Sequence, residues 1–197
     1  MRLFIAINLP ENIKEVVERM VNDLKISINQ LNQHKSAAEI RFLPKENWHL
    51  TITFLGYQPD EAVSLILKPI QETAADFDPV LIKFEKIIYG PPGKPARMLW
   101  LAGAEKTSRN LGEIKEKLEN ELIKNKVNFR QENRQFHTHL TLARFQYEEV
   151  ELPKKVPLPK IDCCFEAKTL DLMESRLKRT GAEYESISRF AFRSSVL

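Results

Sequence analysis

The stretch WHLTITFLG, residues 48–56, and the stretch HLTLAR, residues 139–144, decide how this chain is expected to fold. Both contain the pattern His-aliphatic-Thr-aliphatic, which begins at His49 in the first stretch and at His139 in the second. Side chains alternate between the two faces of a β-strand, so each stretch places its histidine and threonine on one face and its aliphatic residues on the other. The repeat therefore predicts two related strands that offer imidazoles and hydroxyls to a common surface.

Around these two stretches the sequence alternates between helical and strand-like patterns. Apolar residues at helical spacing predict helices over residues 10–28, 60–75 and 111–125. Apolar and β-branched runs bounded by turn residues predict strands over residues 2–9, 39–43, 48–55, 80–88, 97–102, 136–145, 168–177 and 183–192. Short strands interspersed with three helices predict an α+β fold with largely antiparallel sheets.

The composition is that of a folded, globular protein. Of the 197 residues, 43% are hydrophobic and 29% are charged, and no linker divides the chain, so we expect one domain over residues 1–197. The net charge of +3 permits an anionic ligand but is weak evidence for wrapping a duplex. The apolar stretch Leu3–Leu9 is too short for a signal peptide or a membrane span, so we expect a cytoplasmic protein without a membrane partner.

Two imidazoles that face each other would supply what the opening of a phosphodiester by in-line displacement needs. One group takes a proton from the attacking oxygen, and the other gives a proton to the leaving oxygen on the opposite side of phosphorus. Histidine suits both tasks because its ordinary pKa is about 6.5. The hydroxyls of Thr51 and Thr141 can donate to the nonbridging phosphate oxygens. The repeat thus indicates a phosphoesterase site with His49 and His139 as its catalytic pair.

Arg144 is the last residue of the second stretch, and its guanidinium has paired donors whose geometry suits phosphate. It lies five residues beyond His139, so an unbroken strand would point it to the opposite face. A contact between Arg144 and phosphate therefore requires a bulge, a bend or a strand end.

The two stretches resemble the 2H phosphoesterase superfamily, which is named for its two His-x-Thr motifs. They resemble in particular the RNA 2′,3′-cyclic phosphodiesterases, formerly called 2′,5′ RNA ligases. The resemblance also includes residues 2–7 (RLFIAI), residues 172–177 (LMESRL), Gly181 and Tyr184, and so covers most of the chain. Thr138 departs from the pattern, because a proline is expected before the second catalytic histidine.

This resemblance implies a bilobal fold of two related antiparallel sheets, with helices outside and a central active-site groove. It implies metal-independent hydrolysis of a terminal RNA 2′,3′-cyclic phosphate to a 2′-phosphate, with no cofactor. His49 would then donate a proton to the departing 3′ oxygen, and His139 would activate water. The substrate-binding residues would be Thr51, Thr141 and Arg144. The expected partner is RNA or an oligonucleotide with a cyclic phosphate end, and we expect a monomer.

A zinc site is one alternative that the sequence leaves open. It would use His49, His137 and His139, since two histidines two apart on a strand can share a metal. Catalytic zinc needs about three protein ligands and an open position. This interpretation leaves the repeated threonines unexplained.

Two further alternatives concern RNA. The chain could be a binding module without turnover, or it could catalyse ligation through the 2′ hydroxyl, which is the reverse chemistry in the same site. Aromatic residues that could stack a base are Phe42, Trp48 and Phe136. Basic residues that could contact a nucleic-acid backbone are Lys94, Arg97, Arg130 and Arg134.

Overall fold

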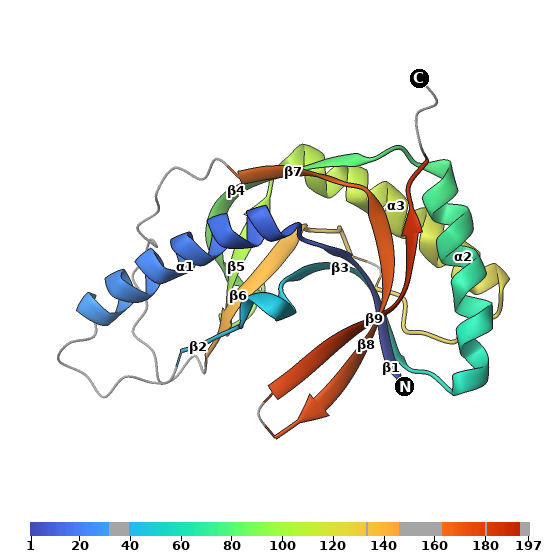
Figure 1. Ribbon diagram of the computed structural model, residues 1–197, viewed down its shortest axis with the longest axis horizontal. Helices are drawn as coiled ribbons and strands as arrows, with labels where there is room; N and C mark the ends of the chain where they lie inside the picture. Colours follow the sequence, from blue (N-terminus) through green and yellow to red (C-terminus); the bar gives the residue numbers. More distant parts are fainter. Residues whose placement is uncertain (32–39, 133, 146–162, 180, 194–197) are drawn as a thin grey trace.

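The computed structural model of the chain describes residues 1–31, 40–132, 134–145, 163–179 and 181–193 (Figure 1). Its helices are α1 (Glu11–Leu31), α2 (Val63–Asp76) and α3 (Glu105–Lys124), with short 3₁₀ turns at Lys45–Asn47 and Asp60–Ala62. Its strands are β1 (Arg2–Asn8), β2 (Arg41–Phe42), β3 (His49–Tyr57), β4 (Val80–Gly90), β5 (Met98–Gly103), β6 (His139–Arg144), β7 (Cys163–Ala167), β8 (Thr169–Lys178) and β9 (Gly181–Ala191).

The strands form two sheets. Sheet A has the order β3-β1-β8-β9 and sheet B has the order β2-β6-β5-β4-β7, and every pairing described is antiparallel. The two histidine-containing strands belong to different sheets, yet β3 and β6 contact each other. The predicted α+β class with two antiparallel sheets is confirmed.

The helices lie outside the sheets and each buries one apolar stripe. α1 lies along sheet B and contacts β7, whereas α2 packs on β8 and β9, and α3 packs on α2, β3 and β4 (Figure 1). The stripe of α3 is fully buried and consists of Leu111, Ile114, Leu118 and Leu122. Truncating one such leucine to alanine costs about 2–5 kcal/mol of unfolding free energy. This packing of α3 holds β3, the first of the two motif strands, in place.

The strand expected over residues 136–145 begins only at His139. Thr138 donates its backbone N–H to Ser108 Oγ of α3 at 3.1 Å, and its carbonyl accepts the Gly103 N–H at 2.9 Å. A proline has no N–H for the bond to Ser108. The departure at Thr138 therefore coincides with a local hydrogen bond that the expected proline could not make.

β7 was missed from the sequence. It shows strand-like alternation of burial and pairs with β4, but only Lys168 separates it from β8. Because β7 and β8 are separated by one residue, the sequence pattern did not distinguish β7 from the strand that follows it. The strand expected over residues 39–43 is also shorter than predicted, since β2 spans Arg41–Phe42 and residue 39 lies outside the described ranges.

Candidate active site

The two histidine motifs fold alike, including an irregularity at the same place. The pairing of β3 with β1 skips Ile52, and the pairing of β6 with β5 skips Leu142. Both residues are the fourth of their motif, and the first six residues of the two strands share one pattern of burial. In each strand the histidine and threonine are half-buried and the aliphatic residues are buried, as the alternation predicted. The skipped residue in each case is a β-bulge.

Each bulge turns the sixth residue of its motif to the face that carries the histidine and threonine. In β6 that residue is Arg144, and in β3 it is Phe54; both are exposed. An unbroken strand would have placed them on the opposite face. The bulge that Arg144 requires is therefore present, and Phe54 is its counterpart in the first motif.

The end of β6 and the histidine of β3 influence each other. Arg144 is close enough to His49 to lower the pKa of that imidazole, as does His139. At the other end, Phe54, Thr51 and His139 line one hollow. The fold thus brings both histidines, Thr51 and Arg144 to one site, while Thr141 occupies the place in β6 equivalent to that of Thr51.

Each imidazole is oriented by a hydrogen bond to the backbone carbonyl two residues before it. His49 Nδ1 lies 2.9 Å from the Asn47 carbonyl oxygen, and His139 Nδ1 lies 2.8 Å from the His137 carbonyl oxygen. A carbonyl oxygen can only accept, so Nδ1 carries the proton in each ring. Nε2 is left to accept a proton in the neutral ring or to donate one in the charged ring.

Aromatic rings pack against both imidazoles. The His49 ring lies 4.8 Å from Phe4 and 4.9 Å edge-on from Tyr184, centroid to centroid. The His139 ring stacks on Trp100 at 3.8 Å. The indole of Trp100 also lies against Gly90, where any Cβ would overlap the ring. These contacts restrict the rotation of both catalytic candidates.

Burial lowers the pKa of both histidines. The pKa of His49 falls from 6.5 to about 4, chiefly by burial; the Asn47 carbonyl opposes the shift, and His139 and Arg144 add to it. The pKa of His139 is also lowered, first by burial, against the opposing effect of the His137 carbonyl. Both rings are therefore neutral near pH 7 in the unliganded protein.

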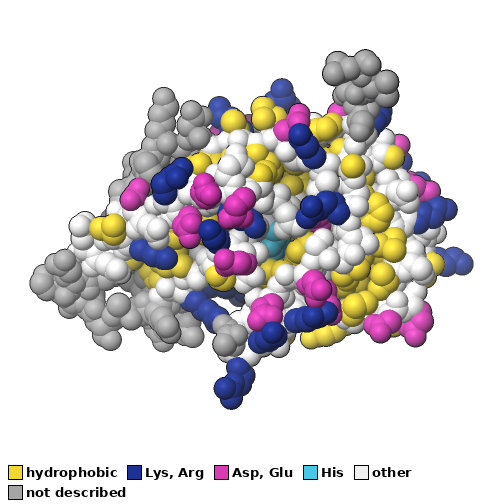
Figure 2. Space-filling view, viewed as in Figure 1, with side chains coloured by type: hydrophobic (Ala, Val, Ile, Leu, Met, Phe, Trp, Pro, Cys, Tyr) yellow, Lys and Arg dark blue, Asp and Glu magenta, His cyan; other side chains and the backbone are white. Residues whose placement is uncertain are grey.

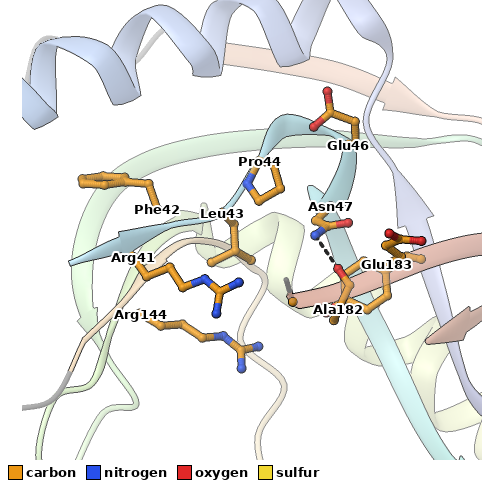
Figure 3. Close-up of a pocket in the computed structure, with 11 residues that line it drawn as sticks. Arg41, Phe42, Leu43, Pro44, Glu46, Asn47, Arg144, Ala182 and Glu183 are labelled. Carbon is orange, nitrogen blue, oxygen red and sulfur yellow. Dashed lines mark hydrogen bonds between the residues drawn. The ribbon is translucent and has the colours of Figure 1, made fainter. Parts of the chain in front are cut away.

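Two hollows flank the motif strands. The first, here called the arginine hollow, has a volume of about 420 Å³ and is lined by Arg41, Arg144, Asn47 and Tyr184, among others (Figure 3). The second, here called the aromatic hollow, has a volume of about 660 Å³. Its lining includes Thr51, Phe54, Trp100, Phe136 and His139. Figure 2 shows a histidine near the centre of one face, with both basic and acidic side chains around it.

The other sequence candidates are divided between site and core. Lys94, Arg130 and Arg134 line the aromatic hollow, and Arg97 is exposed just before β5. Phe136 and Phe42 each line a hollow, whereas Trp48 is 2% exposed and belongs to the core. Sequence reasoning missed several lining residues, because no local pattern distinguishes them from core or surface residues: Arg41, Phe54, Trp100 and Tyr184.

The zinc alternative needs His49, His137 and His139 to converge on one point. In the part of the chain that the structure describes, no three His, Cys, Asp or Glu side chains are grouped so that they could hold a metal ion. Two imidazoles, each held by the backbone carbonyl two residues before it, with the Arg144 guanidinium near His49, are instead the features of a class of protein, the two-histidine phosphoesterases.

Comparison with known proteins places the chain within that class. A sequence profile of "LigT like Phosphoesterase" matches residues 7–100. The RNA 2′,3′-cyclic phosphodiesterase of Methanocaldococcus jannaschii is 30% identical, over 96% of this chain and 100% of that protein. The protein of the same name from Bacillus subtilis is 27% identical, over 95% of this chain and 94% of that protein. The chain therefore belongs to the LigT-like phosphoesterase family of the 2H superfamily, and it is an enzyme.

Solved structures agree on the fold. The protein TT0787 of Thermus thermophilus superposes with a TM-score of 0.72 at 24% identity, over 98% of both chains. E. coli LigT complexed with 3′-AMP superposes with a TM-score of 0.66 at 22% identity, again over 98% of both chains. The arrangement of two sheets with outer helices is thus the arrangement of these proteins.

Proposed function

We propose that this enzyme hydrolyses the 2′,3′-cyclic phosphate at an RNA end to a 2′-phosphate, without a metal ion. The observation that carries the proposal is the matched pair of imidazoles, each with Nδ1 bound to a carbonyl and Nε2 left for a substrate. Relatives named RNA 2′,3′-cyclic phosphodiesterase along nearly the whole chain support the substrate class.

In the proposed reaction His139 is the base and His49 is the acid. His139 Nε2 accepts a proton from water as the water oxygen forms a bond to phosphorus. The bond from phosphorus to O3′ breaks, and His49 Nε2 donates its proton to O3′. The negative charge of the bound phosphate favours the imidazolium form of His49, which raises the pKa that burial lowers. The product carries a 2′-phosphate and a 3′ hydroxyl, and proton exchange with solvent resets the pair.

The remaining site residues hold the charge on phosphorus. The hydroxyls of Thr51 and Thr141 donate to nonbridging oxygens, and Arg144 adds a fixed positive charge with paired donors. Donors that are positioned before the reaction stabilise developing charge without reorganisation. These roles explain why the threonine recurs in both motifs.

Hydrolysis is expected to survive chelation. The test incubates EDTA-treated protein with a short RNA that ends in 2′,3′-cyclic phosphate and identifies the terminal phosphate of the product. We expect a 2′-phosphate at the rate of untreated protein. Loss of turnover that zinc restores would favour the metal alternative, and binding without turnover would favour the binding module. Accumulation of joined product with a 5′-hydroxyl RNA would show ligation.

The pH dependence of kcat/KM is expected to be bell-shaped, with its maximum below pH 6.5. This profile reports the groups of the free enzyme, where the pKa of His49 is about 4 and that of His139 is also lowered. The bound phosphate raises both values, so the maximum of kcat lies at higher pH than that of kcat/KM. The apparent pKa values belong to the coupled pair. A monotonic profile, with chemistry rate-limiting, would contradict a paired acid and base.

Other expectations concern the whole protein. Among the described residues, no helix is long and apolar enough to cross a membrane. The cytoplasmic location, the monomeric state and the single domain over residues 1–197 stay predictions.

A further inference from the structure

Two arginines face each other at the edge of the site. Arg41 and Arg144 are direct partners in the antiparallel pairing of β2 with β6. An anion that lies between two guanidinium groups is attracted by both and can accept paired hydrogen bonds from each. Both guanidinium groups extend into the arginine hollow (Figure 3). Its volume of about 420 Å³ lies in the range of ligand sites.

Residues from distant segments of the chain form the walls of this hollow. Asn47 Nδ2 donates to the Ala182 carbonyl at 2.8 Å, which ties the segment before β3 to the start of β9 (Figure 3). Gly181 has a φ of +138°, which favours glycine, and a Cβ there would lie 2.5 Å from Arg41 Nη2. A glycine at this position therefore leaves the space that the Arg41 guanidinium uses.

Two carboxylates also line the hollow but lie apart from its centre. Glu183 binds Lys178 Nζ at 2.6 Å. Glu46 extends away from the two guanidinium groups (Figure 3). Among the described residues that line the hollow, the two guanidinium groups therefore offer donors to its interior, and the two carboxylates lie away from them (Figure 3).

The covalent structure of the proposed substrate indicates which of its phosphates would lie in the arginine hollow. In a ribose 2′,3′-cyclic phosphate, C2′ is next to C1′ with the base, while C3′ is next to C4′ with the 5′ substituent. The phosphate that joins the terminal nucleotide to the preceding one is therefore on the O3′ side of the ring. His49 protonates O3′ in the proposed reaction, and Arg144, which lines the arginine hollow, lies beside His49. The base then lies toward His139 and the aromatic hollow.

We propose that the arginine hollow binds the phosphodiester that joins the terminal nucleotide to the preceding one, with Arg41 as its principal contact. This inference rests on the proposed function, since it takes its orientation from the role of His49. The site makes the enzyme prefer RNA ends over free nucleoside 2′,3′-cyclic phosphates. The recognised group is a phosphate diester or monoester on the 5′ oxygen, whatever the base.

The test compares two substrates that differ only at that position: a nucleoside 2′,3′-cyclic phosphate and the same compound with a 5′-phosphate. For the parent enzyme at low salt, we expect kcat/KM to be about tenfold higher with the 5′-phosphate, the size of a charge-assisted contact at a partly exposed site. The ratio should fall as salt rises, because ions screen the contact.

Arg41→Ala is expected to bring this ratio close to one, and Arg41→Lys to give an intermediate value because the point charge stays and the fork is lost. Arg41 is exposed, so neither change removes a core side chain. The matched control is Arg109→Ala, which removes an exposed arginine of α3 and should keep the parent ratio. A parent ratio near one, or a parent-like ratio in Arg41→Ala, overturns this inference. Failure of the parent to hydrolyse either substrate overturns the proposed function instead.

Discussion

Replacing either His49 or His139 by alanine is expected to lower kcat about 10²- to 10⁴-fold on an RNA 2′,3′-cyclic phosphate, the usual contribution of one positioned acid or base. Each ring supplies a proton transfer that the other cannot make from its own side of phosphorus. The measurement is single-turnover hydrolysis with saturating enzyme, so that weaker binding does not enter the rate.

The double variant tests whether the two rings act as a unit. Groups that act together show strongly non-additive effects, so His49→Ala with His139→Ala should be little slower than the slower single variant. If instead the two losses multiply, the histidines act independently, and the paired mechanism is wrong.

His137 provides a matched control for both variants. Its backbone carbonyl, not its imidazole, holds His139 Nδ1, and alanine keeps that carbonyl. His137→Ala should therefore lower kcat less than about tenfold, below the usual share of an acid or base. A loss as large as that of His139→Ala would revive the zinc alternative, in which His137 is a ligand.

The sequence could predict the parts of this fold that depend on local pattern. The apolar stripe of α3 at helical spacing and the alternation in both motifs gave a helix and two strands that the structure confirms. These patterns are local, since each reflects which side of one element meets the core. The family resemblance then predicted two related antiparallel sheets with helices outside, and the structure has two antiparallel sheets.

The features that the sequence could not predict depend on contacts between distant segments. Gly181 and Arg41 meet across the hollow, although 140 positions separate them in the chain (181 minus 41). Trp100 stacks on His139 from the neighbouring strand, which fixes an imidazole that the motif alone leaves free to rotate. Neither contact has a periodic signal, because each involves single residues brought together by sheet order.

The bulges in β3 and β6 could be predicted from the sequence only in part. The sequence alone predicts that Arg144 needs a bulge, a bend or a strand end to reach phosphate, because five residues along a regular strand reverse the face. The matching bulge at Ile52 of β3 could not be predicted, because no role was expected for Phe54 that required a particular face. A shared bulge at the fourth motif residue, more than the four-letter repeat, shows that the two halves of the site are built alike.

Arg144→Ala is expected to lower kcat/KM about 10- to 100-fold, since hydrogen bonds to charged groups contribute about 1.5–3 kcal/mol. Arg144→Lys should recover only part of this loss, because the ammonium keeps the charge but not the paired donors. Arg109→Ala again serves as the control for removing an exposed arginine.

The same variant has a second readout that does not depend on turnover. The charge of Arg144 lowers the pKa of His49, so its removal should raise that pKa from about 4, and an NMR titration of the imidazole measures the shift. The maximum of kcat/KM should move to higher pH in the same direction, because one of its limbs belongs to the pair that contains His49. A lower activity with an unmoved His49 titration would mean that Arg144 binds substrate from beyond the reach of His49. An activity like that of the parent, despite a shifted titration, would mean that the bulge in β6 turns Arg144 toward His49 without bringing it to the phosphate.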